Sequence, residues 1–400
     1  MGVLRETKTP PDFRVVLSPE KCADIVSAHP EVQLTVQPSD IRRYQNEEYS
    51  SRGIYLNEDL SGCDILLGVK EVKKETLIPG KTYFFFSHTI KKQPHNAALL
   101  KAVLEKKIRL IDYELIKDSK GKRLIGFGRY AGIVGCYNGF RLYGLKHGLF
   151  SIKPAHECAD RTELQKELKK VKLPKGMKIV LTGFGRVGNG AVEILSLLNL
   201  RRVEVSAFLN ESFDEPVYCH PDSADCFRRI ADNGFDKREF YTEPELYESA
   251  FTPFCHTADM FVACHYWQKG SPNYFTAEDA MSADWKVSVV ADVSCDVGGP
   301  VGTTLRSSSI AIPFYGFNRQ DGSEVDFMHP EAVAVMAIDN LPCELPRDAS
   351  DDFASEFANN VLPELLNGDA NGILKAATIT NFEGHLNEAF VYLEEYAANG

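Results

Sequence analysis

The sequence of 400 residues has no long hydrophobic run and no recognisable targeting segment. Its longest apolar stretches, such as residues 179–182 and 287–291, have the length of a strand, whereas about 20 apolar residues are needed to cross a bilayer. The first six residues contain no apolar signal segment, and Glu6 stands where a myristoylation signal requires serine or threonine. We therefore expect a cytoplasmic protein with no membrane partner.

Positive charge is also scarce. Lysine and arginine number 45 against 56 aspartates and glutamates, which gives a net charge of −11. Such a chain is unsuited to binding nucleic acid or an anionic membrane through a broad basic surface. An anionic substrate would need a local cationic pocket. No segment recurs with a period of roughly 20–50 residues, so a solenoid is not expected.

Clusters of cysteine are missing, although ten cysteines are present. The sequence has no Cys-x-x-Cys pair and no cysteine and histidine spacing typical of a zinc site. We expect reduced, mostly buried thiols and no metal site.

The chain does contain an alternation of short apolar runs with helical patterns. In the amino-terminal part, strands are predicted at residues 14–17, 33–36, 64–69, 82–86 and 109–111, and helices at 19–28 and 94–106. Strands that alternate with helices are typical of α/β domains. The length of the chain corresponds to two or three domains.

A second α/β domain is expected to begin by residue 177. The patterns predict strands at 177–182, 203–209, 260–263 and 287–292, with a helix at 190–198. The polar residues from 210 to 251 have no place in a minimal nucleotide-binding fold, and we interpret them as an insertion. Further helices are predicted from near residue 330, at 354–366 and at 386–396.

The strongest motif is the glycine-rich segment GFGRVG at residues 183–188, which follows a strand and opens a helix. In that context Gly-x-Gly-x-x-Gly is a fingerprint of dinucleotide binding. Gly183 permits a tight turn, Gly185 lets the backbone approach a pyrophosphate, and Gly188 allows close packing of helix on strand. The N–H groups at the start of the helix attract phosphates. We therefore expect NAD or NADP to bind at Gly183, Gly185, Arg186, Val187 and Gly188.

The choice between NAD and NADP stays open in the sequence. An NAD site usually holds the ribose with an acidic residue about 20 residues after the motif, at the end of the second strand. Glu211 could bind the ribose there, but Asn210 could equally occupy the position. Arg201 or Arg202 could instead meet a 2′-phosphate.

In the first domain, titratable residues follow two apolar strands. Lys70 and Glu71 come after the strand at 64–69, and His88 after the strand at 82–86. Such strand ends border the ligand crevice of α/β folds. Partial burial lowers the pKa of a lysine towards neutrality, where histidine already titrates, so Lys70 and His88 could share acid and base roles. A solvated lysine and a structural histidine are the alternatives.

Four further cations, Arg5, Lys8, Arg14 and Arg123, lie in the first domain. Guanidinium groups bind carboxylates in a bidentate manner, which suits an anionic metabolite. For each of them, ordinary surface charge is an equal alternative.

Several segments together resemble one known family. Its members are the lysine-forming saccharopine dehydrogenases and the lysine–2-oxoglutarate reductase half of the animal bifunctional enzyme, with alanine dehydrogenase as a more distant relative. The similar segments are LRETK at 4–8, GVKE at 68–71, KTYFFFSHTIKKQ at 81–93, RLIDYE at 109–114, GFGRYAG at 126–132, ADVSCDVGGP at 291–300 and AIDNLPCELPRDAS at 337–350.

The resemblance implies an α/β fold with two Rossmann-like domains and a cleft between them. A dinucleotide-binding domain at residues 139–335 would be inserted in a substrate domain made of residues 1–138 and 336–400. It also implies reversible oxidative deamination of saccharopine to L-lysine and 2-oxoglutarate through an imine, with hydride passing from the glutaryl Cα to the nicotinamide.

The same resemblance implies a role for each of nine residues. Lys70 and His88 would be the catalytic acid–base pair, tuned by Glu71 and Glu114. Substrate carboxylates would be held by Arg14 and Arg123, with Lys8 nearby and Phe127 lining the pocket. Asp339 would face the cofactor, although an aspartate at this place is also a common turn residue.

Two other functions remain open. An enzyme similar to alanine dehydrogenase, or an opine-type dehydrogenase with another amine, would use the same kind of Lys/His pair. A catalytically silent regulator that binds a nucleotide belongs to another class. The sequence leaves the oligomeric state and the metabolic direction undetermined.

Overall fold

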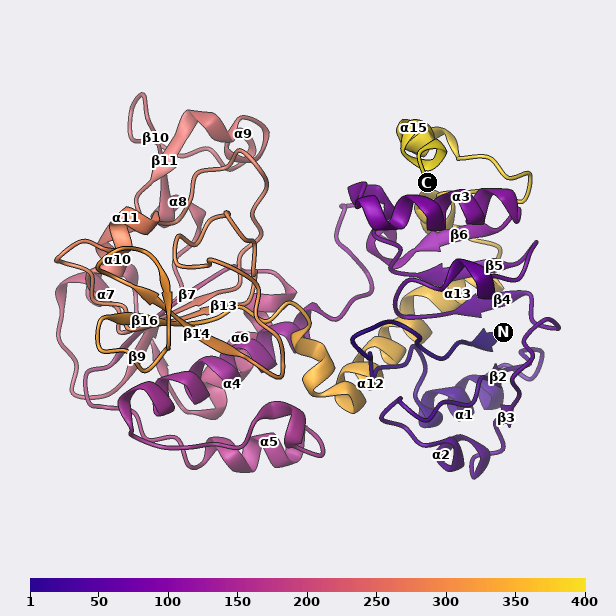
Figure 1. The fold of residues 1–400 in the computed structure, drawn as a ribbon, viewed down its shortest axis with the longest axis horizontal. Helices are drawn as coiled ribbons and strands as arrows, with labels where there is room; N and C mark the ends of the chain where they lie inside the picture. The colour runs from indigo at the N-terminus through magenta and orange to yellow at the C-terminus, as the bar shows by residue number, and fades with distance from the viewer. The chain divides into compact units, whose positions relative to one another are not determined.

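The computed structural model describes residues 1–400, which divide into two compact units. Unit 1 comprises residues 1–127 and 346–400, and unit 2 comprises residues 128–345. The chain thus leaves unit 1, completes unit 2 and returns. The joins expected at 138/139 and 335/336 fall inside helix α4 (Gly128–His147) and strand β16 (Ala332–Met336), both of which run on without interruption. Each unit is an α/β domain (Figure 1).

Unit 1 is built on a six-stranded parallel sheet with the strand order β3-β2-β1-β4-β5-β6. Its strands are β1 (Gly2–Val3), β2 (Thr35–Val36), β3 (Tyr55–Leu56), β4 (Ile65–Leu67), β5 (Thr82–Phe85) and β6 (Arg109–Asp112). Its helices are α1 (Pro19–Ala28), α2 (Asn46–Ser50), α3 (Ala97–Glu105), α12 (Pro346–Glu356), α13 (Leu362–Leu366), α14 (Ile373–Ala377) and α15 (Glu394–Ala398).

One predicted strand of unit 1 is absent. Residues 14–17 are buried but form no strand. The backbone N–H of Val15 donates to the Ser350 hydroxyl at 2.9 Å instead of to a neighbouring strand. Residues 2 and 3 form β1 in the middle of the sheet, between β2 and β4. The apolar run from Val15 to Leu17 therefore packs into the core as an irregular segment that leads to the Ser18 cap of α1.

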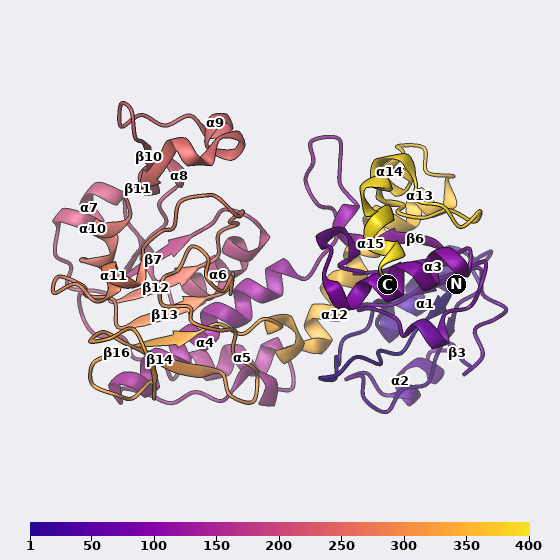
Figure 2. The ribbon, with the colours of Figure 1, turned by 45° about the horizontal axis from the view of Figure 1, so that its top comes forward.

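Both faces of this sheet are buried because successive side chains point to opposite sides. Leu67, Phe84 and Ile111 are neighbours in register and pack on one face, together with Phe353 of α12. The other face packs against α3 and α15, which lie side by side (Figure 2). The carboxy-terminal segment thus covers parts of both faces.

Unit 2 is built on an eight-stranded sheet with the order β15-β14-β16-β13-β12-β7-β9-β8, in which only β14 runs antiparallel to its neighbours. Its strands are β7 (Lys178–Thr182), β8 (Arg201–Arg202), β9 (Val217–Cys219), β12 (Met260–Ala263), β13 (Val289–Asp292), β14 (Phe314–Asn318), β15 (Glu324–Val325) and β16. Its helices are α4, α5 (Arg161–Leu168), α6 (Arg186–Leu197), α7 (Val205–Asn210), α8 (Ser223–Cys226), α9 (Lys237–Thr242), α10 (Thr252–Cys255) and α11 (Ala277–Ala280).

Glycines allow α4 and α6 to pack with their backbones in near contact. A Cβ on Gly132 of α4 would lie 1.8 Å from the carbonyl oxygen of Val187, and one on Gly190 of α6 would lie 2.0 Å from that of Arg129. No side chain fits at either position. This close pairing holds α6, the helix that follows the glycine-rich motif, in place.

Two predictions for unit 2 are wrong. Residues 203–209, expected as a strand, contain helix α7, because Val205, Phe208 and Leu209 have the i, i+3, i+4 spacing of one helix face and pack on the core. The expected helix near residue 330 is β16, a wholly buried apolar run that pairs with β13 and β14. Burial on both faces removes the alternation by which a strand is recognised.

The insertion is shorter than the expected range 210–251, because residues 217–219 are strand β9 of the large sheet. Residues 221–251 form a small module. Strands β10 (Phe227–Arg229) and β11 (Tyr247–Ser249) pair as an antiparallel hairpin, with α8 before them and α9 between them. These elements stand together beyond one end of the large sheet (Figures 1 and 2).

None of the helices combines the length and the apolar character that a bilayer crossing requires. All ten cysteines are free thiols, and eight of them are buried.

Candidate active site

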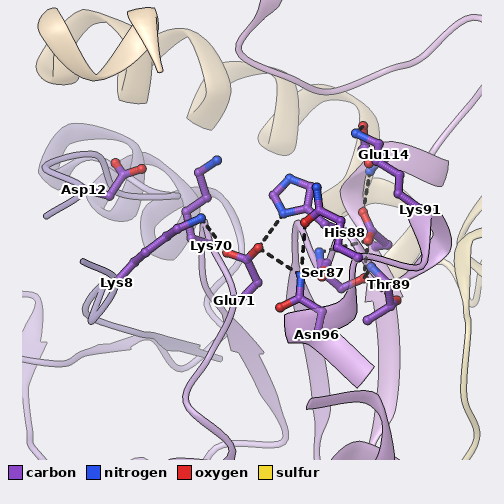
Figure 3. A network of polar contacts seen from close by, with 12 residues as sticks. Lys8, Asp12, Lys70, Glu71, Ser87, His88, Thr89, Lys91, Asn96 and Glu114 are labelled. Carbon is purple, nitrogen blue, oxygen red and sulfur yellow. Dashed lines mark hydrogen bonds and ion pairs between the residues drawn. The ribbon is translucent and has the colours of Figure 1, made fainter. Parts of the chain in front are cut away.

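The carboxyl ends of β4 and β5 bring a group of titratable side chains together in unit 1 (Figure 3). Lys70 and Glu71 follow β4, and His88 follows β5 through Ser87. His88 has a φ of 52°, a left-handed conformation that is uncommon for a residue other than glycine. Ser87 is held by the buried carboxylate of Asp112, which accepts from its N–H at 2.9 Å and its hydroxyl at 2.5 Å. The carboxylate of Asp112 therefore fixes the turn that carries His88.

Glu71 orients the imidazole of His88. Its carboxylate lies 2.6 Å from His88 Nδ1, 3.2 Å from Lys8 Nζ and 3.3 Å from Asn96 Nδ2. Burial alone would raise the pKa of Glu71, but the His88 hydrogen bond and the charges of His88 and Lys8 outweigh it and hold the pKa far below its usual value. Because a carboxylate only accepts, Nδ1 carries the hydrogen and Nε2 is the nitrogen that can take a proton.

Lys70 lies beside a buried ion pair. The Arg14 guanidinium donates to both carboxylate oxygens of Asp12, at 2.9 and 2.5 Å, and these side chains are only 3% and 1% exposed. Burial and the positive charge of Arg14 lower the pKa of Lys70, against the opposing charge of Asp12. Glu6 accepts the backbone N–H groups of Val69 and Lys70 at 2.7 and 2.9 Å. The lysine is thus fixed at its backbone and has a reduced affinity for its proton.

Glu114 lies at the end of β6, within the same edge of the sheet. One of its oxygens accepts from Lys91 at 3.0 Å and from Arg123 at 3.2 Å. Its other oxygen is buried and has no protein partner. Phe127 stacks on Phe353 with 4.4 Å between ring centroids and also faces the guanidinium of Arg14.

The structure therefore gathers all eight predicted catalytic and substrate-binding residues into unit 1, around one sheet edge or its adjoining loops. A lysine with lowered proton affinity and a histidine held in one tautomer, at the ends of neighbouring strands, are groups that can exchange protons with a ligand. Sequence reasoning missed Glu6, Asp12 and Asn96. An acidic residue two positions before Arg14 was a usable signal for Asp12, whereas Glu6 and Asn96 reach the site through the fold.

The glycine-rich segment of unit 2 fits a phosphate group. Gly183 has a φ of 92°, and a Cβ there would lie 2.3 Å from the carbonyl oxygen of Cys264. A Cβ on Gly188 would lie 1.7 Å from the Gly183 oxygen. By contrast, a Cβ on Gly185 would meet nothing within 4 Å, and no side chain caps the start of α6. The open space before this 12-residue helix is where a pyrophosphate would be held.

The ribose prediction at Glu211 needs correction. Lys178, at the first position of β7, donates to the carbonyl oxygen of Glu211 at 2.7 Å, whereas the glycine motif follows the last residue of β7. Glu211 therefore lies at the opposite edge of the sheet. The reason is the helix at 205–210, which displaces the second strand to β9.

His220 follows β9 and occupies the place expected for the acidic residue. Its Nε2 donates to the carbonyl oxygen of Gly183 at 2.8 Å, and its ring stacks on Phe184 with centroids 3.9 Å apart. Arg202, at the end of β8, donates to the carbonyl oxygen of His220 at 3.2 Å. The end of the second strand thus presents a histidine, with an arginine beside it, to the glycine segment.

Asp339 is exposed and follows β16, whose parallel neighbours β13, β12 and β7 lead to the glycine segment at the same edge of the sheet. Its charge acts on the nearby thiol of Cys295. Within the chain, no group of three histidine, cysteine, aspartate or glutamate side chains could hold a metal ion.

Comparison with known proteins agrees with the fold. The family described as "Alanine dehydrogenase/PNT, N-terminal domain" matches residues 2–134. Among solved structures, an L-alanine dehydrogenase superposes with a TM-score of 0.65 at 18% identity, covering 99% of this chain and 100% of its own. A transhydrogenase from Sinorhizobium meliloti has a TM-score of 0.62 at 15% identity, covering 96% of this chain and 99% of its own. These structures show the two-domain Rossmann-type fold.

Among curated proteins, the alpha-aminoadipic semialdehyde synthase of Arabidopsis thaliana is 30% identical over 98% of this chain and 40% of its own length. The mitochondrial enzyme of that name from Mus musculus is 28% identical over 99% and 47%. The chain therefore spans less than half of these relatives. A saccharopine dehydrogenase [NAD(+), L-lysine-forming] from Yarrowia lipolytica is 24% identical over 91% of this chain and 90% of its own.

The fold is the two-domain Rossmann-type fold that an L-alanine dehydrogenase also has. Over nearly its whole length the chain is similar to alpha-aminoadipic semialdehyde synthases and to saccharopine dehydrogenases, and its first 134 residues include the match to the alanine dehydrogenase/PNT family.

Proposed function

We propose that this protein catalyses the reversible oxidative deamination of saccharopine to L-lysine and 2-oxoglutarate with a nicotinamide dinucleotide. The observation that carries the proposal is the placement of Lys70 and His88 at the carboxyl ends of the neighbouring strands β4 and β5, with Glu71 bonded to the imidazole. The family relatives support the substrate, because they are named for saccharopine or for the synthase that contains a related segment.

The nicotinamide, when bound, supplies the acceptor for the hydride that leaves the glutaryl Cα. Its pyrophosphate would be held by the turn of Gly183, Gly185 and Gly188, because the space in front of Gly185 is open. Saccharopine reacts as a neutral secondary amine, so a base must first remove the ammonium proton. Lys70 suits this role because burial and Arg14 lower its pKa. Loss of the hydride then leaves a C=N bond.

His88 suits the hydrolysis of that imine. Its Nε2 takes a proton from the attacking water while Glu71 stabilises the imidazolium through Nδ1. The nitrogen of the resulting carbinolamine takes a proton, and its C–N bond breaks as the hydroxyl group gives up its own proton, which releases lysine and 2-oxoglutarate. In the reverse direction the same two groups exchange acid and base roles.

For the substrate carboxylates, the geometry supports Arg123 more than Arg14. Arg123 is 43% exposed and uses one N–H toward Glu114. Arg14 is 3% exposed and already holds Asp12 with two N–H groups. In this proposal Arg14 acts mainly through its charge on Lys70, and Arg123 meets the ligand.

A series of assays with different amines tests the reaction. Oxidation of NADH or NADPH is followed at the absorbance band of the reduced nicotinamide, with 2-oxoglutarate and in turn lysine, ornithine, alanine or ammonia. Turnover that requires lysine supports the proposal. Turnover with ammonia alone would favour the alanine-dehydrogenase type, and silence with every amine would favour a regulator.

Two variants test the catalytic assignment. Lys70→Met and His88→Gln are each expected to lower turnover by roughly 10²–10⁴-fold, the range of a lost acid or base. The exposed neighbours Lys73 and His95 offer matched controls, as Lys73→Met and His95→Gln. Unchanged turnover in both Lys70→Met and His88→Gln would contradict the assignment.

For the cofactor, we infer a preference for NADP over NAD. The support is the histidine at the end of β9 where an NAD site has a carboxylate, with the guanidinium of Arg202 beside it. Arg202→Ala is expected to raise KM for NADPH roughly 10- to 100-fold, the effect of losing a charged hydrogen bond, and to leave KM for NADH unchanged. Arg201→Ala is the control, since Arg201 lies on the same strand and pairs with Glu215 at 2.6 Å. Equal KM values for NADPH in wild type and Arg202→Ala would contradict it.

A further inference from the structure

A cavity of about 970 Å³ in unit 2 extends from the glycine segment to the inserted module. One part of its wall is Gly185 and Arg186, and another is Phe235, Lys237 and Tyr241 of the insertion. The loop after β12, which includes Tyr266, completes it. The volume is at the upper end of the range for small-molecule sites, and only a part of it adjoins the phosphate-binding turn.

The inserted module contributes an ordered group of aromatic rings to the core of unit 2. The rings of Phe227 and Phe240 stack with centroids 4.8 Å apart, and the ring of Phe235 meets Tyr247 edge-on at 5.6 Å. Arg229 forms ion pairs with Asp232 and Glu239 at 2.8 and 2.7 Å. These contacts order the module, so that it can hold a residue that lines the cavity in a fixed position.

Three large aromatic rings line this cavity and remain exposed. Phe184 is 52% exposed, Tyr241 44% and Tyr266 78%. The loop that carries Tyr266 is tied to the module, because Gln268 Nε2 donates to the carbonyl oxygen of Tyr241 at 3.1 Å. Exposed aromatic rings gathered at one cavity are typical of a site for a flat apolar group.

The course of the chain after β9 indicates which part of a dinucleotide would lie in this cavity. In Rossmann-type sites the end of the second strand holds the adenosine ribose. Here that strand is β9, and the chain continues from His220 directly into the inserted module. The group attached to that ribose, the adenine, would thus extend away from the glycine segment towards Tyr241 and Tyr266.

We propose that the inserted module, residues 221–251, forms with Tyr266 a binding subsite for the adenine ring of the dinucleotide. This inference rests on the proposed function, because it assumes that the cavity holds a nicotinamide dinucleotide. The insertion is then part of the cofactor site. The aromatic rings add affinity by stacking, which is independent of whether the ribose carries a 2′-phosphate.

Fragments of the cofactor test the subsite on the full chain. Calorimetric titration with ADP-ribose, ADP-ribose 2′-phosphate and nicotinamide mononucleotide gives a Kd for each half of the dinucleotide. Tyr241→Ala is expected to weaken binding of the adenine-containing fragment roughly 5- to 100-fold, the range for loss of one base-stacking ring. Nicotinamide mononucleotide should bind as in wild type, and Tyr241→Phe, which keeps the ring, should bind the adenine fragment as in wild type.

Tyr266→Ala provides a second variant on a separate loop, with the same expected selective loss. If both alanine variants bind the adenine fragments with wild-type Kd while the full cofactor binds normally, the subsite is refuted and the proposed function is untouched. If wild type binds neither the fragments nor NAD(H) or NADP(H), the proposed function itself fails.

Discussion

Glu6 is a buried carboxyl whose ionisation is expected to reduce the stability of unit 1. Its side chain receives the backbone N–H groups of Val69 and Lys70, and the residue is 7% exposed. Burial, followed by the negative charge of Asp12, raises the pKa of Glu6 from 4.5 to about 7, and the two N–H groups and Arg14 oppose this only in part. The folded protein therefore binds this proton more tightly than the unfolded chain does.

The sign of the pH dependence follows from this difference. Between the two pKa values the folded state carries the proton and the unfolded state has lost it. The stabilisation is fully present below the unfolded pKa of 4.5 and is lost as pH rises through the folded pKa of about 7. Because a pKa difference of one corresponds to roughly 1.4 kcal/mol, the loss amounts to about 3 kcal/mol.

Urea unfolding followed by far-ultraviolet circular dichroism measures this loss. Wild type and Glu6→Gln, which cannot titrate at this position, are compared at a series of pH values from about 4.5 to 8. We expect the free energy of unfolding of wild type to fall relative to the variant by about 3 kcal/mol across that interval. Glu58→Gln, at a 61% exposed side chain, is the control and should run parallel to wild type. Parallel curves for wild type and Glu6→Gln would refute the reasoning.

Further substitutions test the packing around both sites. Gly188→Ala places a Cβ 1.7 Å from the Gly183 oxygen and should lower the melting temperature as well as cofactor binding, whereas Gly185→Ala meets no protein atom and should weaken only cofactor binding. Equal melting temperatures for the two variants would contradict the close approach. Asp12→Asn takes the carboxylate from a buried guanidinium, so denaturant unfolding should show a loss of roughly 3–5 kcal/mol. A loss below about 1 kcal/mol would indicate that Arg14 is held mainly by other groups.

The grouping of the titratable side chains was predictable because it depends on local pattern. Lys70 and His88 each follow an apolar run, and parallel strands that are neighbours place such residues at one edge. The glycine motif was equally readable, since its turn requires small residues at fixed spacing. In both cases a few consecutive residues determine the geometry.

The partners of these groups were harder to predict because they come from irregular or distant segments. Glu6 and Asp12 lie outside helices and strands, and Asn96 reaches Glu71 from a short 3-10 turn. The misplaced ribose position at Glu211 had a similar origin: α7 uses apolar residues that also suit a strand, and tertiary packing decides between them. An error in one element thus displaced the whole second strand.

The discontinuity of unit 1 has a consequence for how the protein is made. The N–H of Ile379 donates to the carbonyl oxygen of Leu110 at 2.7 Å, and the Phe353 ring covers Phe127, so the amino-terminal sheet depends on residues that are synthesised after unit 2. Unit 2 is a continuous segment and is synthesised before those residues. The nascent chain would therefore carry a complete glycine-motif domain next to an unfinished sheet with uncovered aromatic side chains. Such an intermediate is a natural client for a chaperone.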